Sequence, residues 1–262
     1  MSYKYLLYEK KERIAYITIN RPEVMNAICP PASDEMWEAF SDFRDDPEAW
    51  VVILTGAGEK AFSAGNDLKY QAQHGSDPAY MAIKTPGGFG GITEHYYCAK
   101  PMIAAVNGYA LGGGFELALK CDIIIAADHA QFGLPEAKVG LIAGAGGIHR
   151  LPRMIPQKIA LGMMFTGRPI SAQEAYRIGL VNEVVPLKDL MSTADRWADD
   201  ILHGSPLTIQ ATKEAALRGL DMKLEEAINT VFPGVDRLFK SEDFVEGPLA
   251  FFEKRPPQWK GR

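Results

Sequence analysis

Two short apolar runs, each followed by a glycine-rich turn, constrain the fold of this chain more than any other feature. They are residues 51–55 (VVILT) and residues 102–106 (MIAAV). A strand without polar alternation is typical of a mostly parallel sheet whose two faces are covered by helices. The strand–turn–helix modules around residues 51–68 and 102–120 therefore indicate two turns of one winding, and they predict an α/β core.

The segments around these modules fit such a core. Alternation over residues 14–19 predicts the second strand of a hairpin, separated from the first by residues 9–13. Apolar residues at i, i+4 and i+7 from Met36 to Phe43 predict an amphipathic helix with Ser33 as its N-cap. A third core strand is expected over residues 122–126.

The last third of the sequence is predicted to be helical. A helix is expected from about Leu190 to His203, and Ser205-Pro206 marks the start of the next helix. We therefore expect two parts, an α/β core over residues 1–188 and a helical region over residues 189–262.

Composition and charge exclude several classes of function. The 262 residues include 28 Lys and Arg against 33 Asp and Glu, a net charge of −5, so no chain-wide basic field favours nucleic acid. The most apolar stretch, residues 102–119, is interrupted by Asn107, Glu116 and four glycines, which argues against a membrane-spanning helix. The N-terminus shows no secretory signal, so we expect a cytoplasmic protein.

Cysteine and histidine usage predicts neither disulfides nor a metal site. Cys29, Cys98 and Cys121 form no ligand cluster, and we expect buried free thiols in a reducing compartment. The five histidines occur singly and no HExxH motif is present, so no metal is predicted.

The first glycine-rich turn, residues 56–61, matches the pattern G-x-G-x-x-[GA] that binds the pyrophosphate of dinucleotides. That function needs a helix to begin at the turn, and residues 63–66 (SAGN) interrupt any such helix. A tight turn at the end of a strand is the favoured interpretation.

The second glycine-rich turn contains Gly112, Gly113 and Gly114. Consecutive glycines leave amide N–H groups open to a ligand, and a helix that starts immediately afterwards adds partial positive charge, as in an oxyanion hole. Close packing of backbone against backbone explains the glycines equally well, so both interpretations stay open here.

Two carboxylates lie near candidate turns. Glu116 is in the first turn of an apolar helix, and Glu136 follows an apolar loop. Compensation of the helix dipole would account for Glu116, and a solvated acid paired with Lys138 would account for Glu136. Two partly desolvated carboxylates beside an oxyanion hole can instead move protons on and off a substrate. The sequence spacing does not show whether they converge.

Nearly the whole chain resembles the crotonase (enoyl-CoA hydratase/isomerase) superfamily. The runs that carry the resemblance are residues 20–27, 60–68, 101–116, 132–136 and 144–147. The resemblance implies a spiral of ββα units, C-terminal helices used in trimer contacts, and a homotrimer or a hexamer of two trimers. It also implies an acyl-CoA thioester substrate and no separate cofactor, since coenzyme A is part of the substrate.

The resemblance also implies roles for individual residues. The amides of Asn66 and Gly113 would form the oxyanion hole, and Glu116 and Glu136 would be the catalytic pair of a hydratase. The residues expected to bind coenzyme A or substrate are Ala64, Asn66, Asp67, Leu68 and Gly113. The implied reaction is reversible addition of water across the C2=C3 bond of a 2-enoyl-CoA, with the acid and base roles unassigned. Isomerase or thioesterase chemistry at the same hole, and RNA binding, are the more distant alternatives.

A narrower likeness points to the carnitinyl-CoA dehydratase (crotonobetainyl-CoA hydratase) branch. It is carried by residues 43–47, 87–94, 114–119, 134–138, 246–251 and 259–262. Asn66 departs from the bulky aromatic residue expected in that branch, and this puts the preferred acyl group in question. A trimethylammonium substrate favours aromatic faces, which Phe89, Tyr96 and Tyr97 are candidates to supply, although core packing also explains such rings. This activity is therefore the named alternative to general enoyl-CoA hydration.

Overall fold

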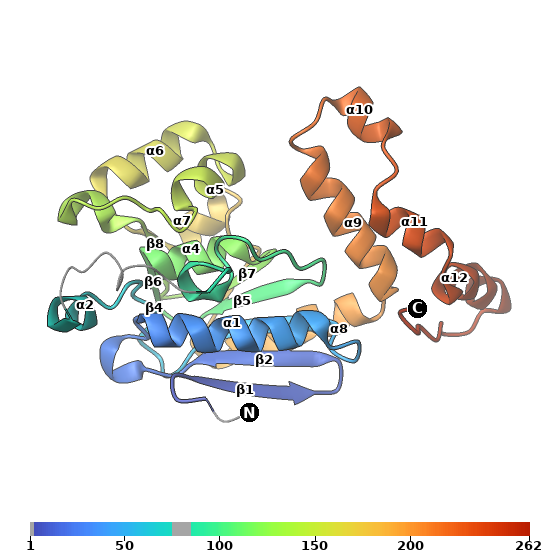
Figure 1. The fold of residues 1–262 in the computed structure, drawn as a ribbon, viewed down its shortest axis with the longest axis horizontal. Helices are drawn as coiled ribbons and strands as arrows, with labels where there is room; N and C mark the ends of the chain where they lie inside the picture. The colour runs from blue at the N-terminus through green and yellow to red at the C-terminus, as the bar shows by residue number, and fades with distance from the viewer. Residues whose placement is uncertain (1–2, 75–84) are drawn as a thin grey trace.

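The computed structural model describes residues 3–74 and 85–262, and within them two sheets form the core (Figure 1). The larger sheet has the strand order β1-β2-β3-β5-β7-β10 and the smaller has the order β4-β6-β8-β9. The strands are β1 (Leu6–Lys11), β2 (Ile14–Ile19), β3 (Val51–Gly56), β4 (Ala61–Ser63), β5 (Met102–Val106), β6 (Tyr109–Leu111), β7 (Ile123–Ala127), β8 (Gln131–Gly133), β9 (Ile170–Ser171) and β10 (Glu183–Val185).

The helices cover the sheets and form the C-terminal third of the chain. Those before residue 190 are α1 (Pro30–Asp45), α2 (Leu68–His74), α4 (Gly113–Lys120), α5 (Gly147–Met154), α6 (Gln157–Thr166) and α7 (Ala172–Arg177). The short 3₁₀ helices are η1 (Pro22–Val24), η2 (Phe89–Gly91), η3 (Pro135–Val139) and η4 (Leu187–Asp189). No helix in the described part of the chain is both long and apolar enough to cross a membrane.

The N-terminal hairpin is confirmed, but its turn is shorter than expected. β1 and β2 pair antiparallel up to Lys11 and Ile14, so residues 9–11 extend the first strand instead of separating the two. Only Glu12 and Arg13 form the turn, and Glu12 adopts a left-handed φ of 55° there. Charged residues are tolerated in β1 because Glu9, Lys10 and Lys11 are all exposed at the end of this edge strand.

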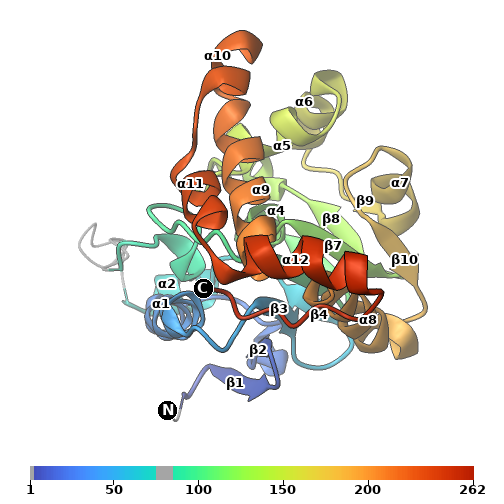
Figure 2. The same cartoon turned by 90° about the vertical axis from the view of Figure 1, so that its right-hand side faces the viewer.

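The apolar runs form the buried centre of the larger sheet, as predicted. β2, β3, β5, β7 and β10 are parallel neighbours, with Ile53 opposite Ile103 at the centre. Every residue of β3 and β5 is buried, because α1 covers one face of the sheet and α8 the other (Figure 2).

The helix predicted between Ser33 and Phe43 is longer, and its predicted N-cap is wrong. α1 begins at Pro30, with Cys29 at the N-cap position, because the fixed φ of proline suits the first helical residue. Ser33 lies inside the helix, and its hydroxyl accepts a 3.0 Å hydrogen bond from the amide of Gly90.

The smaller sheet places the second glycine-rich turn beside Glu136. β6 and β8 are parallel, and Leu111 is opposite Gly133 at their carboxyl ends. β6 leads directly into α4 and β8 into η3, so the starts of α4 and η3 lie next to each other. The first glycine-rich turn, in contrast, continues into β4, and no helix begins until Leu68. It is the tight turn that the sequence favours, with Gly58 at φ +78°.

The chain after residue 189 is helical, as predicted. The helices are α8 (Leu190–Leu202), α9 (Pro206–Gly219), α10 (Leu224–Asn229), α11 (Pro233–Phe239) and α12 (Glu242–Glu253). Ser205 caps α9 by accepting from the amide of Thr208. α8 packs on the larger sheet, whereas α9 to α12 extend away from it as an arm (Figure 1). The division of the chain at residue 189 stays a prediction.

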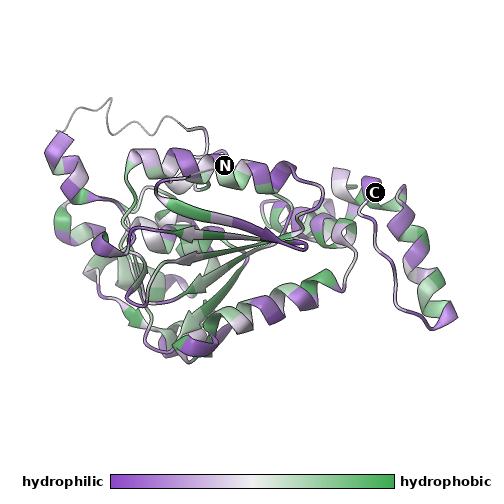
Figure 3. Ribbon diagram, turned by 90° about the horizontal axis from the view of Figure 1, so that it is seen from below, coloured by the Kyte–Doolittle hydropathy of each residue, from purple (hydrophilic) through white to green (hydrophobic). Residues whose placement is uncertain are grey.

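Green apolar segments recur on this arm when the ribbon is coloured by hydropathy (Figure 3). Large apolar side chains that the chain itself leaves exposed on the arm are Leu217, Leu220, Leu224, Ile228, Val231, Phe239, Phe244, Val245, Leu249, Phe251 and Phe252. The three cysteines, by contrast, are buried and free, as expected.

Candidate active site

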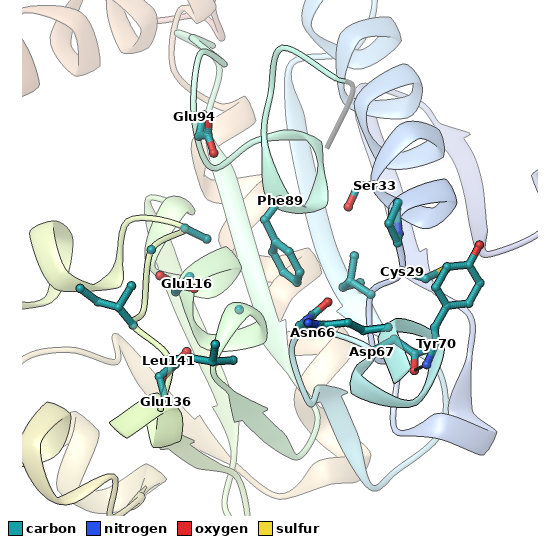
Figure 4. Close-up of a pocket in the computed structure, with 17 residues that line it drawn as sticks. Cys29, Ser33, Asn66, Asp67, Tyr70, Phe89, Glu94, Glu116, Glu136 and Leu141 are labelled. Atoms are coloured by element: carbon teal, nitrogen blue, oxygen red, sulfur yellow. Dashed lines mark hydrogen bonds between the residues drawn. The ribbon is translucent and has the colours of Figure 1, made fainter. Parts of the chain in front are cut away.

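A pocket of about 410 Å³ is lined by the starts of α1, α2 and α4, by η2 and η3, and by the loop before α5, and it contains most of the candidate residues (Figure 4). Asn66, Asp67, Gly113, Glu116 and Glu136 line it. They come from the start of α2, the start of α4 and from η3, which the order of the smaller sheet brings together.

The two predicted oxyanion-hole amides lie on segments in direct contact. Gly65 has φ +89°, and a Cβ there would lie only 2.8 Å from the amide nitrogen of Gly113 and 2.7 Å from the carbonyl oxygen of Leu111. Within the described residues, neither the amide of Asn66 nor that of Gly113 donates a hydrogen bond to another protein group. Two free amides therefore border the pocket, the second at the start of a helix, where negative charge is stabilised.

The glycines of the second glycine-rich turn differ in their surroundings, and the oxyanion-hole interpretation stays a prediction. A Cβ at Gly114 would lie 2.1 Å from the carbonyl oxygen of Ser63, so close backbone packing requires that glycine. Gly113 presents its free amide to the pocket, and a Cβ there would lie 2.4 Å from the ring of Phe89.

Glu116 is a buried carboxylate with a pKa near neutrality. It projects from the first turn of α4 and is 3% exposed. Burial raises its pKa to about 7, while the amide of Gly147, which donates a 2.7 Å hydrogen bond to its Oε1, and the positive charge of Arg150 act in the opposite direction. Compensation of the helix dipole alone does not require such burial.

Glu136 projects into the same pocket from η3. Burial raises its pKa as well, and its Oε2 is a buried oxygen without a hydrogen-bond partner in the structure. No ion pair with Lys138 occurs in the part of the chain that the structure describes, so the solvated-acid interpretation is not supported. A buried carboxylate oxygen aimed at a cavity is costly unless a ligand or water completes it.

The other predicted binding residues are not all brought to the pocket. The carboxylate of Asp67 lies in the lining but is paired with Arg21 at 2.8 Å and accepts the amide of Tyr70 at 2.9 Å. Ala64 and Leu68 are outside the lining, and Leu68 is exposed at the start of α2. Their role in binding coenzyme A stays a prediction.

Of the three aromatic rings expected near the acyl group, the structure brings only Phe89 to the pocket. Tyr96 is buried in the core, where its hydroxyl donates a 2.7 Å hydrogen bond to the carbonyl of Phe40. Tyr97 is 55% exposed and does not line the pocket. Tyr96 therefore has the core-packing role that the sequence analysis also gave for such rings, and Tyr97 does not lie in the described lining as a candidate for the acyl end.

Sequence reasoning assigned no role to Gly147, Arg150 or Glu94. Arg150 donates from its guanidinium to the carbonyl oxygens of Ala145, at 2.9 Å, and Thr93, at 2.7 Å. It thereby joins the loop before α5 to the loop after η2, beside Glu116. The glycine run at residues 144–147 was the available signal, because it precedes a helix whose first amide is free to bind an anion.

The structure adds one observation on metals. Among residues 3–74 and 85–262, no three His, Cys, Asp or Glu side chains are grouped to hold a metal ion.

Comparison with known protein families matches the enoyl-CoA hydratase/isomerase model to residues 9–262. The chain belongs to this family, the crotonases. It is 49% identical over 253 residues to the carnitinyl-CoA dehydratase of Escherichia coli K12, covering 95% of each chain. The carnitinyl-CoA dehydratase of Salmonella arizonae is also 49% identical, over 252 residues.

Solved structures of crotonases have the same fold. An enoyl-CoA hydratase from Mycobacterium marinum superposes with a TM-score of 0.91 at 40% identity and covers 98% of this chain and 99% of its own. Another, from Mycobacterium tuberculosis, gives a TM-score of 0.88 at 38% identity, with coverage of 98% and 99%. The predicted crotonase fold and the predicted enzyme class, a hydro-lyase, are confirmed.

Proposed function

We propose that this crotonase adds water reversibly across the C2=C3 bond of a 2-enoyl-CoA thioester. The observation that carries the proposal is one pocket that contains buried Glu116, half-buried Glu136 and the free amides of Asn66 and Gly113. A carboxyl group whose pKa is raised to about 7, as that of Glu116 is, both holds and releases protons at neutral pH.

The chemistry follows from these positions. The amides of Asn66 and Gly113 would bind the thioester oxygen, on which negative charge develops as water attacks C3. One carboxylate takes the proton from that water, and the other carboxyl gives its proton to C2, so the proton count balances. The geometry supports either assignment of the two roles. An isomerase that moves one double bond needs a single base, so a second carboxylate in the same pocket favours hydration.

Coenzyme A would lie along residues 64–68, outside the oxyanion hole. The side chain of Asn66 supports this path, because its amide donates a 2.8 Å hydrogen bond to Gln71 on α2. The side chain is therefore held against α2, and the backbone amide is left for the thioester. The unexpected residue type at position 66 is compatible with the proposed site.

A second candidate is the dehydration of carnitinyl-CoA, or the hydration of crotonobetainyl-CoA in reverse. Two observations favour it: relatives 49% identical over 95% of the chain are carnitinyl-CoA dehydratases, and among the described residues the pocket lining contains carboxylates but no Lys or Arg. Both candidates use the same reaction and differ only in the acyl group.

We further propose that the arm formed by α9 to α12 packs against other copies of the chain, as a homotrimer or a hexamer of two trimers. Exposed Phe251 and Phe252 support this, because large apolar patches on a protein surface mark interfaces. A cytoplasmic location is supported by the three buried free thiols, which are typical of a reducing compartment.

The test follows the absorbance of the conjugated enoyl-thioester with the purified protein. Crotonyl-CoA, a longer 2-enoyl-CoA, a cinnamoyl-type CoA and crotonobetainyl-CoA are compared at equal concentrations. We expect loss of absorbance with at least one straight enoyl chain or with crotonobetainyl-CoA. No loss with any of the four would overturn the proposal and leave isomerase and thioesterase assays as the next step.

A further inference from the structure

The pocket has two ends, with the proposed reacting centre between them. Tyr70 and Asp67 lie at one end, beside the proposed path of coenzyme A (Figure 4). Glu94 lies at the opposite end, and the ring of Phe89 stands between it and Asn66. An acyl chain whose thioester sits at Asn66 and that passes the ring of Phe89 would extend toward Glu94.

The side chain at the acyl end that carries charge is the carboxylate of Glu94, and the guanidinium of Arg150 lies behind the same loop, bonded to the carbonyl oxygen of Thr93. No Lys or Arg lines the pocket among the described residues, and the carboxylate of Asp67 is neutralised by Arg21. The carboxylate of Glu94 takes part in no hydrogen bond or ion pair in that part of the chain. A carboxylate that lines a pocket without an ion-pair partner favours a positive group there and disfavours a negative one.

The loop that carries Phe89 and Glu94 is held as one unit. The hydroxyl of Thr93 donates to the carbonyl of Phe89 at 2.8 Å, and the amide of Glu94 donates to the carbonyl of Gly87 at 2.9 Å. The side chain of Glu94 lies over Gly88, where a Cβ would be 2.5 Å from its Cγ. A side chain other than glycine at position 88 would therefore displace Glu94 from its place.

We propose that Phe89 and Glu94 form an acyl-end subsite that selects a substrate with a cationic group, such as a quaternary ammonium, beyond C3 of the enoyl chain. A quaternary ammonium has no N–H to donate, so it is recognised by an aromatic face and by the field of a nearby carboxylate. In this proposal, two residues that take no part in proton transfer determine which acyl group the pocket prefers. This inference rests on the proposed hydration of 2-enoyl-CoA.

The test uses three substrates that differ in charge at one position. They are crotonobetainyl-CoA, its neutral isostere 5,5-dimethylhex-2-enoyl-CoA, in which carbon replaces the ammonium nitrogen, and the CoA thioester of a 4-carboxy-crotonyl group. For each enzyme variant, kcat/KM for the charged substrates is divided by kcat/KM for the isostere. The ratio removes any general loss of activity or folding.

For the wild-type chain we expect the cationic substrate to be preferred over the isostere and the anionic substrate to be the poorest. Glu94→Gln should lower the cation-to-isostere ratio about fivefold, and Phe89→Leu should lower it about tenfold. Glu94→Lys should raise the anion-to-isostere ratio. The matched control, Glu59→Gln, removes the same charge from an exposed turn outside the pocket and should leave both ratios unchanged.

Two negative results are distinguishable. If the wild-type chain hydrates none of the three substrates nor crotonyl-CoA, the proposed function fails. If it hydrates the isostere or crotonyl-CoA but Glu94→Gln and Glu94→Lys leave the ratios unchanged, hydration stands and the cationic subsite is wrong.

Discussion

The amide of Gly147 donates a 2.7 Å hydrogen bond to Oε1 of Glu116, so the first residue of α5 holds a carboxylate that projects from α4. An amide at a helix N-terminus stabilises the ionised form, whereas burial favours the neutral form. Burial prevails, and the pKa of Glu116 rises to about 7. Near neutral pH this group is poised to transfer a proton.

Burial of the ionised Glu116 carboxylate lowers the stability of the folded protein, and the size of this effect depends on pH. In the unfolded chain Glu116 has an ordinary pKa near 4.5, so the folded state binds more protons between about pH 4.5 and 7. The contribution of Glu116 to the free energy of unfolding therefore falls as the pH rises through that window. We expect Glu116→Gln, which keeps an oxygen for Gly147, to stabilise the protein by about 2–3 kcal/mol at pH 8 and by much less at pH 5.

Urea unfolding at pH 5 and pH 8, at one protein concentration, measures this difference. Glu59→Gln serves as the control, since it removes an exposed carboxylate and should change little at either pH. Equal effects of Glu116→Gln at the two pH values would show that the carboxyl is not held at a raised pKa.

Arg150 is expected to position Glu116 and to lower its pKa. Its charge attracts the carboxylate, and its hydrogen bonds to Thr93 and Ala145 fix the loops on either side. Arg150→Met removes that attraction, so the pKa of Glu116 should rise further. We expect the limb of the pH profile of kcat/KM that reports Glu116 to move to higher pH, with an activity loss of about tenfold at pH 7.

Arg153→Met is the matched control, because Arg153 lies on the same helix but is exposed. A loss of activity in Arg150→Met without any movement of the profile would mean that the arginine only supports the fold.

Gly113 is expected to tolerate no side chain. A Cβ at this position would lie 2.4 Å from the ring of Phe89, so Gly113→Ala has to displace the ring or the amide. Loss of one oxyanion-hole donor lowers kcat about 10²–10³-fold. Steady-state kinetics with the preferred enoyl-CoA measure this, and a variant with unchanged kcat would remove Gly113 from the oxyanion hole.

Gly162 provides the comparison for that substitution. It lies within α6, and a Cβ there would meet no atom within 4 Å. Gly162→Ala should keep full activity and stabilise the protein by up to about 1 kcal/mol, because alanine is the better helix former.

The exposed rings of the arm should be needed for assembly. Replacing Phe251 and Phe252, which are 87% and 84% exposed, by Asp places two charges where apolar contacts are proposed. Sedimentation analysis should show a trimer or hexamer for the wild-type chain and smaller species for the double variant. A monomeric wild-type chain would contradict the proposed assembly.

Local pattern was sufficient to predict the buried strands and the C-terminal helices. β3 is uniformly apolar because both of its faces are covered, and Ser205-Pro206 combines two start signals at one helix terminus. Ser33 misled the prediction of α1 because its hydroxyl serves a tertiary contact with Gly90 instead of a cap. Local signals do not distinguish these two uses of a serine.

The convergence of Glu116 and Glu136 was beyond the reach of sequence spacing. It depends on the parallel pairing of β6 with β8, which joins chain segments that spacing alone does not connect. The resemblance to the crotonases identified the two glutamates. The effects of Gly147 and Arg150 on Glu116 became visible only with the packing of α5 on α4. Tyr96 and Tyr97 show the same limit, since side-chain direction in a loop is set by tertiary contacts.

The most direct test of the two-carboxylate account measures kcat for hydration of the preferred enoyl-CoA by Glu116→Gln and by Glu136→Gln. Each substitution keeps the size of the side chain and removes its ability to exchange a proton. We predict that each variant loses at least about 10²-fold in kcat while still binding the substrate. A variant that retains wild-type kcat would contradict the account, because a single carboxylate would then be sufficient for the reaction.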